Sequence, residues 1–342
     1  MTLRRGLHLS LLISVISLAG IFFHTANVET LGSLPGQVNP FFILLCVVGV
    51  PIADWLLAGL RIYIFTRIFA PQISYAACVR NSAVGAFMSA ATPSQTGGSV
   101  AQIYVLVKEG AGVAQAMSVL FMAFLSTLVF YLSVSVTMLV LAAKAGIPGV
   151  ETSIPFLIST ALFGALTIIG FATVTFPERV RLWLRRATVW LEARRLPTRM
   201  ARKVDEVLDE CSELLRMTAR KHRLRFGVAV LLSLLMFGNK FLAGYLAARA
   251  IGLNPPFVDV MVVQVFINVL IYFVPTPGGS GVAEVSTAVL MSRLVPEQML
   301  GPYTVLWRVA TLYLSVMFGG LLLARYLRRD SAARTGSPAR RV

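Results

Sequence analysis

The sequence predicts an all-α polytopic membrane protein with six full transmembrane helices plus two re-entrant broken helices in an inverted-topology repeat. Three observations support this fold class. Hydrophobic residues make up 57% of the 342-residue chain and charged residues only 13%, which is more apolar surface than a soluble core of this length buries. The apolar residues fall into blocks of about twenty, the length that crosses a bilayer as a helix. Two further blocks are interrupted by Pro and Gly near their middles.

The charge distribution indicates the orientation. The net charge is +16, and the basic residues concentrate at the N-terminus, in residues 178–225 and in the C-terminal tail. Loops on the cytoplasmic side of a membrane carry such an excess of Lys and Arg. We therefore interpret the charge as a topology signal with contact to anionic headgroups, rather than as a nucleic-acid-binding surface, and place both termini in the cytoplasm.

Six apolar blocks are long enough to cross the bilayer, namely residues 7–26, 40–61, 113–143, 154–176, 226–250 and 300–324. The first has a short basic lead like that of a signal peptide. No convincing small-residue cleavage site follows it, so we expect a retained helix.

Two more apolar blocks, residues 75–108 and 258–295, contain helix-breaking segments. The first is broken by TPSQTGG at residues 92–98, and the second by PTPGG at residues 275–279. We expect each block to form two half-helices that enter and leave the membrane on one side.

The parity of the crossings places these two re-entrant blocks on opposite faces. If the basic loop and both termini are cytoplasmic, residues 75–108 enter from the cytoplasm and residues 258–295 from outside. This predicts one membrane domain over residues 1–325, followed by a basic cytoplasmic tail at 326–342. Repeat 1 covers about 40–143 and repeat 2 about 226–324. A connector between them contains the basic loop 177–225, whose amphipathic stretch we expect along the cytoplasmic headgroups.

The two breaks share a short motif that supports the repeat. Residues 97–102 read GGSVAQ and residues 278–284 read GGSGVAE, each after a Thr-Pro pair. Irregular backbone at membrane depth survives only where protein or a polar cavity satisfies it. Half-helix N-termini there offer N–H groups and a positive dipole end to an anion. We expect Ser99 and Ser280 to flank one polar cavity, with the paired glycines admitting a lipid headgroup; close helix packing is the alternative role of these glycines.

Charged side chains inside apolar blocks are costly and should face the protein interior. Arg308 is the first candidate for a phosphate ligand, because a guanidinium grips phosphate through two parallel hydrogen bonds, and Arg80 is the second. Glu284 is expected to cap its own helix, to pair with Arg308, or to couple a cation or proton. Asp54 and Lys240 lie near the middle of equivalent helices and form either an ion pair or part of the site. The candidate ligand-binding residues are Arg308, Glu284, Arg80, Thr92, Pro93, Gly97, Gly98, Ser99, Gln102, Pro277, Gly278, Gly279, Ser280, Gly281, Lys240, Asp54 and Asn268.

No pattern of catalytic or metal-binding residues is recognisable. The three histidines lie near predicted membrane edges, and the three cysteines have no paired spacing. We therefore expect no catalytic residue, no metal and no cofactor.

The motifs at residues 91–104 and 274–284, together with Arg308, resemble the lysylphosphatidylglycerol synthase transmembrane-region family of flippase-like integral membrane proteins. The resemblance runs from about residue 40 to residue 325. Pro275, Pro277, Gly278, Gly279, Gly281 and Glu284 match its Pro-x-Pro-Gly-Gly-x-Gly-x-x-Glu segment. The chain is similar to a free-standing member without the aminoacyl-transferase domain.

The resemblance implies lipid transport between the leaflets of a bacterial inner membrane. The expected cargo is an anionic phospholipid or an isoprenoid-phosphate lipid, bound at the midplane between the broken helices. The alternatives are a membrane-embedded subunit of a lipid-modifying or glycosyl-transferring enzyme, and a non-transporting scaffold. The bilayer lipid is the expected partner, with a homo-oligomer or a partner enzyme left open.

The inverted topology predicts opposite accessibility for two substitutions in a background without the native cysteines. Lys108→Cys should react with a membrane-impermeant thiol reagent from the cytoplasmic side, and Pro296→Cys from the external side. Labelling of both positions from one side would contradict the inverted repeat.

Overall fold

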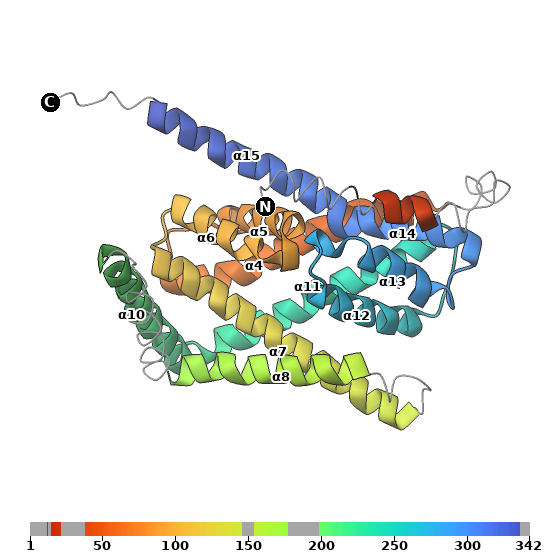
Figure 1. The fold of residues 1–342 in the computed structure, drawn as a ribbon, viewed down its shortest axis with the longest axis horizontal. Coiled ribbons are helices and arrows are strands. Elements are labelled where there is room, and N and C mark those ends of the chain that lie inside the picture. Colours follow the sequence, from red (N-terminus) through yellow and green to blue (C-terminus); the bar gives the residue numbers. More distant parts are fainter. Residues whose placement is uncertain (1–11, 13–14, 22–37, 146–153, 177–197, 336–342) are drawn as a thin grey trace. The chain divides into compact units, whose positions relative to one another are not determined.

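The computed structural model describes residue 12 and residues 15–21, 38–145, 154–176 and 198–335, and the regular structure of these residues is helical (Figure 1). In chain order the elements are α3 (Pro40–Leu44), η1 (Leu45–Gly49), α4 (Val50–Phe69), α5 (Tyr75–Ala91), η2 (Pro93–Gln95), α6 (Gly97–Lys108), α7 (Val113–Ala145), α8 (Ile154–Thr175), α10 (Thr198–Lys221), α11 (Arg223–Ala250), α12 (Phe257–Phe273), η3 (Pro277–Gly279), α13 (Val282–Met291), η4 (Glu297–Met299), α14 (Leu300–Arg308), η5 (Val309–Tyr313) and α15 (Leu314–Thr335).

Four stretches among the described residues are long and apolar enough to cross a membrane: Pro40–Phe69, Val113–Thr137, Arg223–Ala250 and Glu297–Arg329. They confirm four of the predicted crossings, and the first continues eight residues beyond its expected end at Arg61. The block at 154–176 forms α8, in which Thr160–Thr173 is a shorter apolar stretch. The block at 7–26 lies mostly outside the described residues.

The stretch Pro40–Phe69 shows how local sequence shapes a spanning helix. The Asn39 side chain caps it by accepting the N–H groups of Phe41 at 3.1 Å and Phe42 at 3.4 Å. Pro51 lacks an N–H and its ring crowds the preceding turn, and the π-helical turn η1 ends two residues before it. A second π turn, η5, interrupts Glu297–Arg329, and η1 and η5 pack against each other.

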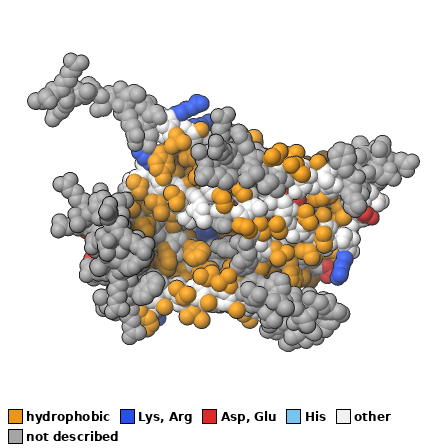
Figure 2. All heavy atoms as spheres, in the orientation of Figure 1, with side chains coloured by type: hydrophobic (Ala, Val, Ile, Leu, Met, Phe, Trp, Pro, Cys, Tyr) orange, Lys and Arg blue, Asp and Glu red, His pale blue; other side chains and the backbone are white. Residues whose placement is uncertain are grey.

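The lipid-facing character of the spanning helices is visible in their exposed side chains. Leu44, Val48, Ile52 and Leu56 are all exposed and recur at four-residue spacing on Pro40–Phe69, which places them on one side of the helix. Hydrophobic side chains predominate on the face shown in Figure 2. This surface is suited to contact with hydrocarbon.

Both predicted breaks interrupt helices at the expected places. α5 ends at Ala91 and α6 begins at Gly97, with the 3₁₀ turn η2 between them. α12 ends at Phe273 and α13 begins at Val282, with η3 between them. The turns η2 and η3 pack against each other, so the structure brings together two segments that are far apart in sequence.

The chain forms two compact units. Unit 1 consists of Met1–Gly59, Val79–Val105 and Met236–Val342, and unit 2 of Leu60–Cys78 and Leu106–Leu235. Each unit draws on both predicted repeats. Both helix breaks, and every candidate ligand-binding residue, belong to unit 1.

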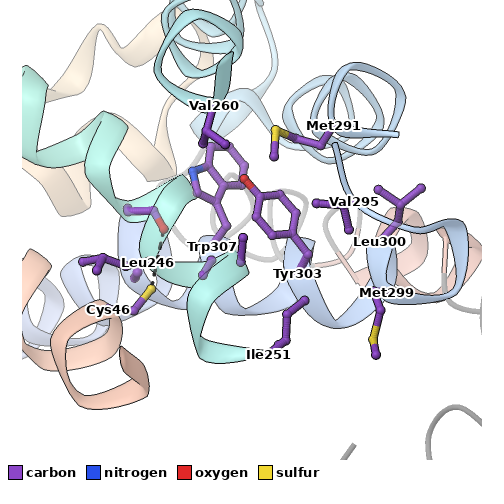
Figure 3. Close-up of a cluster of buried hydrophobic side chains, with 14 of the residues drawn as sticks. Cys46, Leu246, Ile251, Val260, Met291, Val295, Met299, Leu300, Tyr303 and Trp307 are labelled. Atoms are coloured by element: carbon purple, nitrogen blue, oxygen red, sulfur yellow. Dashed lines mark hydrogen bonds between the residues drawn. The ribbon is translucent and has the colours of Figure 1, made fainter. Parts of the chain in front are cut away.

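The main core of unit 1 lies around α14 (Figure 3). Tyr303 and Trp307 are one turn apart on this helix and almost fully buried. Leu246 from α11, Val260 from α12 and Met291 from α13 lie around them (Figure 3). Two large aromatic side chains thus hold the second broken helix against α14.

A second cluster in unit 1 joins α5 and α6 to α15. Phe87, Val105 and Leu322 are among its buried members. A side chain at Gly319 would overlap the carbonyl oxygen of Ala83 and come within 2.8 Å of Phe87 Cβ. The absence of a side chain at Gly319 therefore permits the close approach of α15 to the first broken helix.

Unit 2 packs α10 onto α7 and α8. Leu215 and Thr218 of α10 are buried, and the Cys211 thiol lies 3.4 Å from the Ala114 carbonyl oxygen. Burial raises the pKa of the Cys211 thiol. At these positions the amphipathic helix expected on the headgroups contacts protein.

Gly319→Ala should lower the melting temperature of the detergent-solubilised protein, because the added methyl group overlaps backbone and overpacking typically costs about 1–3 kcal/mol. Gly238→Ala is the matched control, since nothing lies within 4 Å of the added atom and Ala favours helix by about 1 kcal/mol. Equal melting temperatures for the two variants would contradict the close approach of α15.

Candidate functional site

The second break depends on glycine backbone conformations. Gly278, Gly279 and Gly281 have φ angles of 63°, 66° and 88°, a region that residues with a Cβ rarely adopt. The Thr276 hydroxyl donates to the Ser280 carbonyl at 2.9 Å and closes the turn. The side chain of Ser280 is completely buried.

Glu284 joins this break to its own helix and to α14. Its Oε2 accepts the N–H of Gly281 at 2.7 Å, which caps the start of α13. Its Oε1 lies 2.9 Å from Arg308 Nε, although the N–H is not directed at that oxygen. The capping and the pairing predicted as alternatives for Glu284 are thus both present.

The guanidinium of Arg308 also contacts the break directly. It donates long hydrogen bonds of 3.5 Å to the carbonyl oxygens of Gly278 and Gly279. The side chains of Arg308 and Glu284 are 3% and 0% exposed, so the pair is sealed from the surroundings. The ion pair neutralises both charges and satisfies carbonyls that the broken helix leaves open.

The first break uses a hydroxyl in place of this ion pair. The Thr92 hydroxyl donates to the Met88 carbonyl at 2.7 Å and accepts the N–H of Gly97 at 2.9 Å. Gln95 adopts a φ of 57°. A side chain at Gly98 would overlap the Ser89 hydroxyl, so close packing is one role of this glycine.

The two motifs differ at their equivalent final positions. Gln102 stands where the second motif has Glu284, and its backbone carbonyl accepts from Asn81 Nδ2 at 2.7 Å. Its side chain lies over Gly85, where a Cβ would come within 2.7 Å of it. Ser99 and Pro93 are exposed while Ser280 and Pro277 are buried. The cavity expected between Ser99 and Ser280 stays a prediction.

Asp54 and Lys240 form an ion pair between α4 and α11, with 3.6 Å between Nζ and Oδ1. Lys240 also lies 5.5 Å from the centre of the Phe237 ring. The candidates Arg80 and Asn268 have hydrogen-bond partners outside the two breaks. Arg80 Nε donates to the Tyr326 hydroxyl at 3.1 Å, and Asn268 Nδ2 donates to the Gln264 carbonyl on its own helix at 3.0 Å.

Arg61 is half-buried and makes polar contacts that the sequence did not predict. It donates to the hydroxyls of Thr127 at 2.6 Å and Ser233 at 3.1 Å, and Ser126 lies 3.1 Å from Ser233. Arg61 was assigned to the end of a predicted crossing, and its helix instead continues to Phe69. The signal was available in the apolar residues that follow Arg61.

Gln264, a strongly polar residue within an apolar block, faces the protein interior, as such residues are expected to. It is completely buried, and its amide donates to the Tyr303 hydroxyl at 3.1 Å. The glycine at position 244 leaves room for it, because a Cβ there would overlap the Gln264 side chain. The signal for its burial was a strongly polar side chain within the apolar block 258–295, whereas its partner Tyr303 could not be predicted.

Comparison with known proteins identifies the family. Residues 7–319 match the family described as "Lysylphosphatidylglycerol synthase TM region". The chain belongs to this family. A UPF0104 membrane protein of Archaeoglobus fulgidus is 26% identical over 321 residues, covering 92% of this chain and 94% of that protein. The predicted resemblance is confirmed, and the chain is an integral membrane protein of a family connected by name with lipid.

The site contains a buried ion pair, Arg308 with Glu284, that contacts the second of two helix breaks packed against each other. Within the described ranges, no three His, Cys, Asp or Glu side chains gather as metal ligands. The structure brings together the turns η2 and η3 of the two breaks, Arg308 with Glu284, and Asp54 with Lys240.

The buried ion pair generates a stability prediction. Arg308→Ala or Glu284→Ala should each destabilise the protein by about 3–5 kcal/mol, because a lone buried charge remains. The double variant should recover much of this loss. Thermal unfolding in detergent measures all three, with the exposed Arg293→Ala as control; strictly additive losses would contradict the pairing.

Proposed function

We propose that the protein is a lipid translocase that binds an anionic lipid headgroup between its two broken helices. The observation that carries the proposal is the direct packing of η2 against η3 in one unit. Each turn precedes a helix whose first N–H groups lack intrahelical acceptors. Two helix N-termini at one place form a positive region suited to a phosphate.

The proposed topology places this region near the midplane. Residues 75–108 dip from the cytoplasmic face and residues 258–295 from the external face, as halves of an inverted repeat. Both termini and the basic loop at 177–225 lie in the cytoplasm of a bacterial cell, and the protein occupies the inner membrane. Alternating exposure of the breaks to the two leaflets then moves a headgroup across.

The proposed cargo is a phospholipid or isoprenoid lipid with an anionic phosphate. Family membership supports a lipid ligand, and the chain's partner is the bilayer lipid itself. The proposal includes no catalytic step and no cofactor. For Arg308 it implies an exchange in which a phosphate replaces Glu284, since the carboxylate contacts the guanidinium in the structure.

Reconstitution into liposomes tests the proposal. Fluorescent lipids with different headgroups are placed in both leaflets, and an impermeant quencher reports how fast inner-leaflet lipid reaches the outside. We expect the protein to accelerate the exchange of anionic lipids. A rate equal to that of protein-free liposomes for every headgroup would refute the translocase proposal.

In the same assay Arg308→Lys should slow transport at least about tenfold although the charge is kept, because Lys lacks the planar fork that binds phosphate through two bonds. Arg293→Lys, at an exposed position, is the control. Recovery of full transport by the double variant Arg308→Ala/Glu284→Ala would exclude Arg308 as the headgroup ligand.

A further inference from the structure

Two ion pairs among the described residues of unit 1 differ in kind. Arg308 and Glu284 are sealed, in contact at 2.9 Å, and joined to the backbone of the break. Lys240 and Asp54 are separated by 3.6 Å, and their side chains are 34% and 16% exposed. Asp54 Oδ1 has no hydrogen-bond partner. The second pair is therefore a loose and accessible charge contact.

This loose pair lies near the middle of two stretches that are long and apolar enough to cross a membrane. Asp54 is near the middle of the span Pro40–Phe69, and Lys240 is near the middle of the span Arg223–Ala250. Ionisable residues at such depth are costly and typically mark a substrate or ion pathway. A lysine side chain that is one-third exposed at this position can reach a second partner.

Neighbouring contacts hold the helices in place without the ion pair. Asn239 Nδ2 donates to the Val50 carbonyl at 2.9 Å, which ties α11 to α4. Trp55 donates to the Ser315 hydroxyl at 3.1 Å and stacks on Phe318 with 4.5 Å between ring centres, which ties α4 to α15. Because these bonds flank the pair, Lys240 can change its partner while α4 and α11 stay joined.

We propose that Asp54 occupies the position of a lipid phosphate, and that Lys240 exchanges Asp54 for the phosphate of an anionic lipid during transport. The inference rests on the proposed translocase function and assigns Lys240 as a second phosphate ligand. Lys suits this exchange, since its ammonium is a compact charge with three freely rotating donors. Asp54 acts as an internal competitor that keeps the site neutral when no lipid is bound.

A binding measurement in detergent micelles tests the exchange. The probe is a fluorescent phosphatidylglycerol at trace concentration, and a phosphatidylcholine analogue reports non-specific partition. Removing the competitor with Asp54→Asn should tighten binding of the anionic probe about tenfold, and Lys240→Met should weaken it about tenfold, within the range for charges in close contact. Lys240→Met keeps an apolar stem against Phe237. Glu297→Gln and Arg293→Met, at exposed positions, are the charge-matched controls and should leave binding unchanged.

Two further measurements distinguish lipid binding from binding of free phosphate and from a purely structural ion pair. Inorganic phosphate at millimolar concentration should not displace the probe; full displacement would overturn the lipid as the source of the phosphate. Melting temperatures report a purely structural pair. Unchanged probe binding in both single variants, with lowered melting temperatures that the double variant Asp54→Asn/Lys240→Met restores, would overturn the exchange. If Asp54→Asn does not fold, unchanged binding by Lys240→Met alone overturns it.

Micelles have no leaflets, so this experiment does not depend on translocation. If neither single variant changes probe binding while the protein transports lipid in liposomes, this inference is refuted and the proposed function stands. If the variants change probe binding as expected but the protein moves no lipid in liposomes, the proposed function alone is refuted.

Discussion

The backbone of two interrupted helices is the constraint on which the rest of unit 1 depends. Apolar surroundings supply no hydrogen bonds, so every open N–H and carbonyl at a break needs a partner from the protein. Thr92 serves the first break, and Thr276, Glu284 and Arg308 serve the second. The charged residues of the second break follow from this need. A guanidinium that reaches two carbonyls must itself be neutralised, and Glu284 does so while it caps α13.

The same unit handles a second pair of charges in a different way. Around Asp54 and Lys240 the joints between helices are made by neutral groups, namely the Asn239 amide, the Trp55 indole and the Ser315 hydroxyl. Around Arg308 the charged groups themselves connect the helices, because Arg308 of α14 pairs with Glu284 of α13. Two pairs of opposite charges within unit 1 thus differ in how tightly they are built into the packing of the helices.

Much of this arrangement could be predicted from composition and local chemistry. Hydropathy located four spans, and Pro with Gly located both breaks, because these residues act on the backbone wherever they occur. The pairing of Glu284 with Arg308 followed from two opposite charges in apolar segments. The partner of Gln264, the partners of Arg61 and the docking of α10 on α7 depend on which helices become neighbours, and hydropathy carries no information on that. The predicted first crossing and part of the basic loop lie outside the described residues.

The π turn η5 between α14 and α15 changes which side chains of α15 face α4. A π turn holds one more residue than an α turn, so every side chain after Tyr313 is rotated by about 100° from the position that regular winding would give it. Ser315 and Phe318 meet Trp55 only with this offset. A relative that lacks one residue between 309 and 313 can wind this stretch as regular α-helix and, aligned with a one-residue gap, still present the same row of side chains to α4. A single-residue gap here would therefore mark the loss of the π turn and leave the helical face unchanged.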